Sequence, residues 1–149
     1  MQKTSQLTTF RVNGKLYGLD VRSVQEVVKP MPLAPVPHAP PFVMGLINLR
    51  GQIATAIGLL ELFEVGQSRS EQAMNIICNM NGGLVSLFAD EIGDVLEVAN
   101  LKQEGVPPSL PTSIRKLATG GYQVKDEFLV ELDIGKIAST IGVTAPIPS

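Results

Sequence analysis

Residues 42–63, FVMGLINLRGQIATAIGLLELF, decide the fold that this sequence predicts. The apolar run is interrupted by NLRG at 48–51, which is the point where a β-hairpin requires its turn. The flanking segments 42–49 and 52–57 read as two strands around that turn. A single helical turn over 59–65 then completes this unit of the chain.

Other segments repeat the same pattern of short strands and turns. Asn13-Gly14-Lys15 separates two β-prone segments, and Asn-Gly tolerates the positive φ of a two-residue hairpin turn. Further strands are expected at 7–12, 16–19, 73–80, 84–89, 92–98, 114–122 and 127–132. Turn signals every eight to twelve residues favour small β-barrels over a parallel α/β sheet.

Two further helices and a loop are predicted from capping residues and prolines. Asp20 can cap a short helix that places valines at 21, 24, 27 and 28 on one face. Asp133 can cap a last helix that ends at Gly142. Six prolines between Pro30 and Pro41 predict an ordered or extended loop, because proline fixes φ and lacks a backbone donor.

Composition excludes several classes of protein. The 149 residues are 44% hydrophobic and 17% charged, and no apolar run is long enough to span a membrane. The net charge is −2 without a basic cluster, so nucleic acid is not an expected partner. The N-terminus lacks a signal-peptide pattern and Cys78 is the single cysteine, so a reducing cytoplasm is the expected location.

Catalytic chemistry is scarce in this sequence. His38 is the single histidine, so no multi-His or multi-Cys metal site and no recognisable Cys-His pair can be assembled. Cys78 lies in an apolar strand and reads as a small buried hydrophobe. The acidic residues at 90, 91 and 94 read as a solvated strand boundary. We therefore expect no enzyme, no metal and no cofactor.

Two charges lie within apolar segments. Glu26 occurs in SVQEVV and Arg50 in INLRG. Because an unpaired buried charge costs several kcal/mol, a Glu26–Arg50 ion pair is one interpretation. The other is a polar rim around an apolar contact patch, where a planar guanidinium fixes the orientation of a partner. The two interpretations are compatible.

Four motifs together resemble the CheW family of bacterial chemosensory adaptors. They are VQEV at 24–27, GLINLRG at 45–51, ADEIGDVLEV at 89–98 and the segment 117–138 with FLVELD. The resemblance covers about residues 7 to 142. It implies a mainly β fold of two small SH3-like five-stranded barrels with short helices and a C-terminal helix, packed across a shared apolar seam.

The resemblance also implies one CheW-like domain over 1–149. The expected subdomains are about 10–65, with a terminal contribution left open, and about 73–132. The C-terminal helix is expected at about 133–142.

The function implied by the resemblance is that of a cytoplasmic adaptor. It couples the cytoplasmic hairpin tip of a chemoreceptor to the regulatory domain of the histidine kinase CheA, and reaches membrane-associated arrays through these partners without entering the membrane. Motif by motif, the coupling contacts of the first barrel fall on Val24, Glu26, Gly45 and Arg50, with the hairpin residues Ile47, Asn48 and Leu49 in the same surface. The receptor-binding side of the second barrel falls on Met74 and Val95.

Two alternatives remain open at this point. Thr55, Gly58, Leu60 and Ser86 depart from the family pattern, so a divergent paralogue that serves a non-flagellar chemosensory pathway is one of them. A small β-barrel binding module with other ligands is the second, because such barrels host many functions.

Overall fold

The computed structural model describes residues 5–66, 71–80 and 83–142. Most of these residues belong to short strands. The elements, in chain order, are β1 (Gln6–Val12), β2 (Lys15–Asp20), the 3-10 turn η1 (Val21–Ser23), β3 (Val24–Val28), β4 (Val43–Leu49), β5 (Gln52–Gly58), α1 (Leu59–Phe63), β6 (Met74–Met80), β7 (Gly83–Ala89), β8 (Glu91–Glu97), α2 (Thr112–Arg115), β9 (Ala118–Val124), β10 (Glu127–Leu132) and α3 (Ile134–Ile141).

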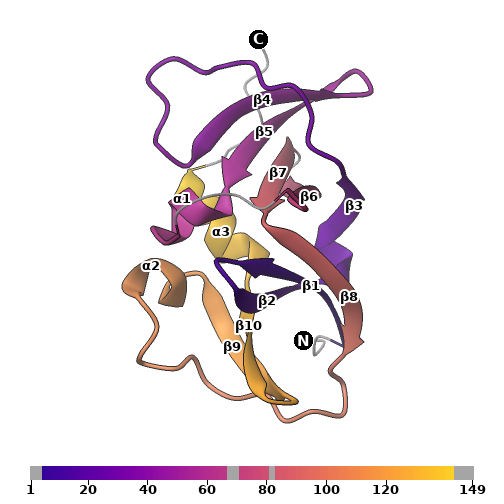
Figure 1. The fold of residues 1–149 in the computed structure, drawn as a ribbon, viewed down its shortest axis with the longest axis vertical. Helices are drawn as coiled ribbons and strands as arrows, with labels where there is room; N and C mark the ends of the chain where they lie inside the picture. Colours follow the sequence, from indigo (N-terminus) through magenta and orange to yellow (C-terminus); the bar gives the residue numbers. More distant parts are fainter. Residues whose placement is uncertain (1–4, 67–70, 81–82, 143–149) are drawn as a thin grey trace.

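The strands form two five-stranded sheets. Sheet A has the order β8-β1-β2-β10-β9, and sheet B has the order β3-β6-β7-β5-β4. In Figure 1, β4 and β5 lie at the top, β9 and β10 at the bottom, and α1 and α3 between them. The predicted mainly β fold with two SH3-like five-stranded subdomains is confirmed.

The two sheets repeat one topology. Each contains a central antiparallel hairpin, β1–β2 or β6–β7, and a parallel pairing of its second strand with β10 or β5. The chain crosses from sheet A to sheet B between β2 and β3, and returns between β7 and β8. Sheet B is thus built from the continuous stretch 24–89, whereas sheet A combines β1 and β2 with β8, β9 and β10, so the strands of the sheets do not follow the expected ranges 10–65 and 73–132.

Neither sheet closes completely. Within the described residues, no ladder joins β8 to β9 or β3 to β4. Single bridges cover two of the edges, Ala34 with Leu46 beside β4 and Glu104 with Gly121 beside β9. The backbone at Ala34 lies close to β4: a Cβ added to Gly45 would lie 2.6 Å from the Ala34 carbonyl oxygen. Only glycine fits that position without displacing the backbone.

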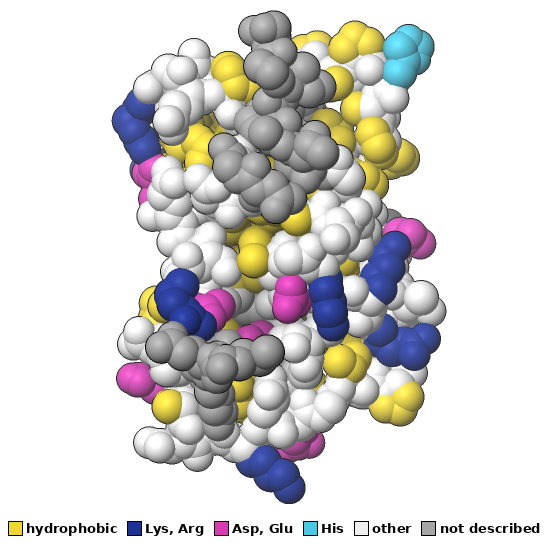
Figure 2. Space-filling view, turned by 180° about the vertical axis from the view of Figure 1, so that it is seen from behind, with side chains coloured by type: hydrophobic (Ala, Val, Ile, Leu, Met, Phe, Trp, Pro, Cys, Tyr) yellow, Lys and Arg dark blue, Asp and Glu magenta, His cyan; other side chains and the backbone are white. Residues whose placement is uncertain are grey.

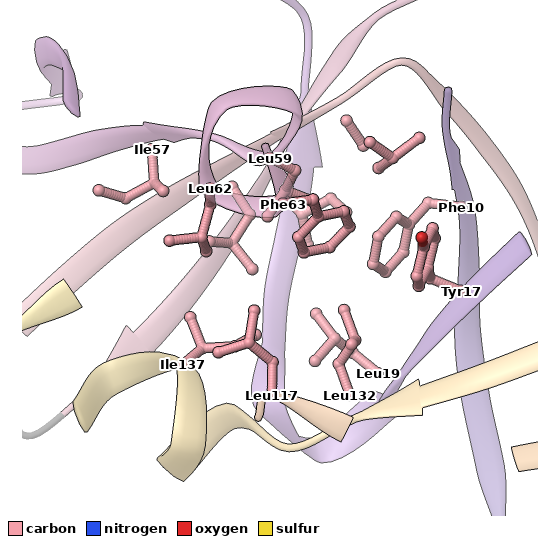
Figure 3. Close-up of a cluster of buried hydrophobic side chains, with 14 of the residues drawn as sticks. Phe10, Tyr17, Leu19, Ile57, Leu59, Leu62, Phe63, Leu117, Leu132 and Ile137 are labelled. Carbon is pink, nitrogen blue, oxygen red and sulfur yellow. The ribbon is translucent and has the colours of Figure 1, made fainter. Parts of the chain in front are cut away.

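A large apolar core joins the sheets, α1 and α3, as Figure 3 shows. The Tyr17 ring on β2 lies 6.0 Å from Phe10 of β1 and 4.9 Å from Phe63 of α1, measured between ring centroids. Smaller cores fill each sheet separately, and Ile47 with Leu49 belongs to that of sheet B. The shared apolar seam expected from the sequence is present.

Both predicted tight turns have the backbone that a two-residue hairpin needs. Asn13 and Gly14 have φ values of 52° and 80°, and Arg50 and Gly51 have 53° and 91°. Positive φ at both positions matches the right-handed twist of the flanking strands. The sequence also predicts a polar, turn-forming connection over 66–72 and a turn at Asn81-Gly82-Gly83; residues 67–70 and 81–82 of these lie outside the described residues.

The predicted helix after Asp20 is wrong. Asp20 caps only the single 3-10 turn of η1, through its Oδ1 and the backbone N–H of Arg22 at 2.9 Å. Val24–Val28 is strand β3, which pairs with β6. Valine's branched Cβ favours this extended backbone, and pairing with β6 decides the outcome.

Two smaller outcomes concern the C-terminal third of the chain. The strand expected from residue 114 begins at Ala118, because Thr112–Arg115 forms α2. The last helix is confirmed: the Asp133 carboxylate accepts from the Lys136 N–H at 3.0 Å, and Gly142 ends α3 with φ 69°. None of the helices in the described part of the chain has the length and apolar character needed to cross a membrane.

Candidate functional site

The predicted ion pair between Glu26 and Arg50 is confirmed. Arg50 lies on the turn between β4 and β5, and its Nη2 donates to Oε2 of Glu26 on β3. Strands β3 and β4 are the two edge strands of sheet B, and in the described residues no hydrogen-bonded ladder joins them. The ion pair therefore links the two edges of the sheet. The Arg50 side chain is 66% exposed and that of Glu26 29%, so the pair contributes only ~0.2–1 kcal/mol to stability.

Of the predicted contact residues on the β4–β5 hairpin, two are buried and two are exposed. Ile47 and Leu49 are 1% and 3% exposed and face the core of sheet B. Asn48 faces solvent, and its Oδ1 accepts from the Gly51 N–H at 2.8 Å, which stabilises the turn. The structure thus presents Arg50 and Asn48 at the surface and holds them there through Ile47 and Leu49.

The other predicted contact residues lie apart from this hairpin. Gly45 is buried against the Ala34 carbonyl. Val24 is half-buried against the shared core, and Met74 is half-buried at the start of β6. Val95 lies on β8 in sheet A and is 56% exposed. The structure therefore brings the hairpin and Glu26 together, while Val95 belongs to a second surface.

The sequence interpretation missed an apolar patch beside β4. Its exposed members are Leu33 and Val36 of the proline-rich segment, on either side of the Ala34 bridge to Leu46, and Ile53, which pairs with Asn48 on the hairpin, is exposed as well. Figure 2 shows hydrophobic side chains around His38, the cyan residue near the top. A small cavity of about 80 Å³ beside this segment is lined by Leu33 and, among others, Met31, Met44 and Phe88. Irregular spacing among prolines left no periodicity to reveal this patch.

Titratable groups in the described residues offer little reactivity. Cys78 is buried, which confirms the prediction, and this burial raises the pKa of its thiol to about 12. His38 is exposed, with φ 61°. Within residues 5–66, 71–80 and 83–142, no group of three His, Cys, Asp or Glu side chains is arranged to hold a metal ion.

Of the three carboxylates predicted to be solvated, two are exposed and one is buried. Glu91 and Asp94 are exposed, as expected. Asp90 is buried instead, and its Oδ2 accepts from the backbone N–H of Asn13 at 2.7 Å. This bond ties the start of β8 to the β1–β2 turn, so Asp90 has a structural role that spacing along the chain did not reveal.

Two SH3-like subdomains with an exposed arginine hairpin and an adjacent apolar patch define a small β protein with a surface suited to contacting other proteins. Comparison with known proteins gives the family: residues 6–142 match the CheW-like domain. The chain belongs to the CheW-like family and is a chemotaxis adaptor.

Individual relatives agree with this assignment. The chain is 32% identical to chemotaxis protein CheW of Treponema pallidum (strain Nichols), over 91% of this chain and 82% of that protein. It is 28% identical to chemotaxis protein CheW of Rhizobium meliloti (strain 1021), over 86% and 84%. The crystal structure of scaffolding protein TtCheW from Thermoanaerobacter tengcongensis superposes with a TM-score of 0.79 and 29% identity, covering 90% of this chain and 87% of that one.

Proposed function

We propose that this adaptor couples the cytoplasmic hairpin tip of a chemoreceptor to the regulatory domain of the histidine kinase CheA. The observation that carries the proposal is the solvent-exposed Arg50, held by Glu26 at the tip of the β4–β5 hairpin. A guanidinium with one fixed partner keeps further N–H donors for a second protein. Its turn therefore presents an oriented donor set rather than a freely moving side chain.

Exposed apolar residues of sheet B support the same proposal. Leu33 and Val36 are exposed beside β4, and Ile53 is exposed on the β4–β5 hairpin that carries Arg50. With Arg50 they would supply the apolar centre and polar rim of a typical protein interface. We assign this surface to the kinase regulatory domain.

Val95 and Met74 form the proposed receptor side. Val95 is exposed on β8, and Met74 lies half-buried on β6. A helical tip that contacts these apolar residues, with the exposed Asp94 and Glu97 beside Val95, binds by helix-in-groove recognition. Such interfaces are modest, so each pairwise contact is expected near micromolar affinity, about −8 kcal/mol, and multivalency in an array strengthens the assembly.

The adaptor acts without catalysis under this proposal. Signal passes through the assembly of its partners, as expected of a CheW-like scaffold. Its place is the cytoplasmic face of a receptor array, which it reaches through its partners.

The test is titration of the purified chain with the CheA regulatory domain and, separately, with a receptor signalling fragment. Arg50→Glu is expected to weaken kinase-domain binding at least about tenfold and leave the fold intact, because the change lies on an exposed turn. Arg115→Glu is the matched control, since Arg115 is an exposed arginine on α2 that donates to Thr112. Loss of binding in both variants would point to net charge instead of the hairpin.

A charge swap separates contact from fold. The double variant Glu26→Arg with Arg50→Glu can re-form an ion pair across the edges of sheet B. Binding that stays weak in the double variant assigns Arg50 to the partner contact. Full recovery of binding would instead assign the pair to positioning the hairpin.

A further inference from the structure

The outer edge of β8 is the most open strand edge in the described residues. β8 pairs with β1 alone. The edge of β9 is covered in part by Glu104, that of β4 by Ala34, and β3 is half-buried and carries the Glu26–Arg50 pair. By contrast, five of the seven β8 residues are exposed. Unpaired N–H and C=O groups on such an edge are a template for another strand.

Backbone alternation shows which groups point outward. The Val98 N–H donates to the Ser5 carbonyl at 2.8 Å, on the β1 side. Because alternate residues of an antiparallel strand direct their N–H and C=O to opposite sides, the backbone groups of Val95 and Glu97 point away from β1. The exposed Val95 side chain adds an apolar contact at the same position.

The edge of β8 is also negatively charged. Glu91, Asp94 and Glu97 are exposed along β8. Beside it lies a cavity of about 300 Å³ whose walls include the apolar Ile92, Leu96 and Val124 and the charged Arg11, Lys125 and Glu127. This space fits one apolar side chain of an added strand. The carboxylates favour a strand that carries lysine or arginine.

We propose that the outer edge of β8 accepts an extended basic segment of another protein as an added strand, with an apolar residue of that segment beside Val95. A second copy of this chain is the disfavoured occupant. Two β8 edges brought together would oppose their carboxylates, which is a common protection against edge-to-edge association. The same carboxylates attract a basic strand, so charge selects the partner.

The added strand and the proposed receptor tip would share Val95, so the inference is tested on the isolated chain, without kinase or receptor. The probe is a fluorescein-labelled seven-residue peptide that alternates lysine and valine, titrated with the full chain and followed by anisotropy. One control peptide has the same side chains with alternate backbone nitrogens methylated, which removes the ladder donors. A second control replaces lysine with glutamate.

The basic peptide is expected to bind saturably, and the methylated peptide at least about tenfold more weakly. Amide hydrogen exchange at Val95 and Glu97 should slow on binding. Glu97→Lys should weaken binding about twofold to fivefold, whereas Glu71→Lys, an equal charge change at an exposed residue outside β8, should not.

Three results would overturn the proposal. Equal binding of the methylated peptide would show attraction to surface charge without strand addition. If Glu71→Lys and Glu97→Lys weaken binding of the basic peptide equally, the peptide responds to the overall charge of the chain and not to the edge of β8. Concentration-dependent dimerisation of the free chain, abolished by Val95→Pro, would assign the edge to a second copy.

Discussion

Replacing Gly45 with alanine should destabilise the protein strongly, although the change adds one methyl group. Gly45 has φ 147°, a backbone conformation that side chains rarely adopt, and its added Cβ would lie 2.6 Å from the Ala34 carbonyl oxygen. Strain at such a position costs ~1–3 kcal/mol. Moving Ala34 also disturbs its two backbone bonds with Leu46, both 2.8 Å long, each of which contributes ~1 kcal/mol.

We expect the free energy of unfolding to fall by about 3 kcal/mol, measured by urea denaturation followed by circular dichroism. The matched control is Gly105→Ala, because nothing lies within 4 Å of a Cβ there and its φ is not in the positive region. That variant should change stability by less than ~0.5 kcal/mol. A Gly45→Ala variant as stable as Gly105→Ala would refute the reasoning.

The same experiment decides what Gly45 does in binding. If Gly45 matters only because it allows the close approach of Ala34, the affinity of the Gly45→Ala variant for the kinase domain should equal that of the parent once it is calculated per folded molecule. A fully folded Gly45→Ala variant that still fails to bind would make this glycine a direct contact.

Two other predictions follow from burial and charge. Burial raises the pKa of the Cys78 thiol to about 12, so it stays protonated at pH 8 and should react with a thiol reagent only after unfolding in urea; rapid reaction of the folded chain would contradict this. Arg11 lowers the pKa of the Glu127 carboxyl through a side-chain hydrogen bond and its charge, so the pair's stabilisation is present above the unfolded pKa and is lost as pH falls through the folded one. Glu127→Gln should therefore lose less stability on acidification than the parent, as urea midpoints at pH 6 and pH 3 will show.

Local chemistry explains why the hairpins were predictable. A two-residue turn such as Asn13-Gly14 or Arg50-Gly51 is specified by its own residues and by the strands next to it. The last helix was equally local, since Asp133 and Gly142 mark its ends.

Long-range pairing explains the errors. The three valines of β3 suit either a helix face or a strand, and only β6, some fifty residues further along, decides between them. Sheet A takes strands from both ends of the chain through the parallel pairing of β2 with β10, which no local pattern indicates. Sheet B is one continuous range of the sequence, but its limits at 24 and 89 depend on which strands join sheet A.

The candidate site was predictable to a similar extent. Opposite charges in apolar surroundings indicated the Glu26–Arg50 pair, because isolated charges there are unfavourable. Strand alternation could have shown that Ile47 and Leu49 face the core while Asn48 between them faces solvent. The exposed Leu33 and Val36 lie in an irregular proline-rich segment, where only the three-dimensional structure shows which side chains reach solvent.

The most direct test of the coupling proposal is kinase activity in a reconstituted array. Receptor-containing membranes and CheA from the same organism are mixed with this chain, and CheA autophosphorylation is followed with labelled ATP. Receptor-dependent stimulation is expected with the parent chain and with Arg115→Glu, and none is expected with folded Arg50→Glu. Stimulation that is unchanged by Arg50→Glu, or absent with the folded parent chain, would contradict it.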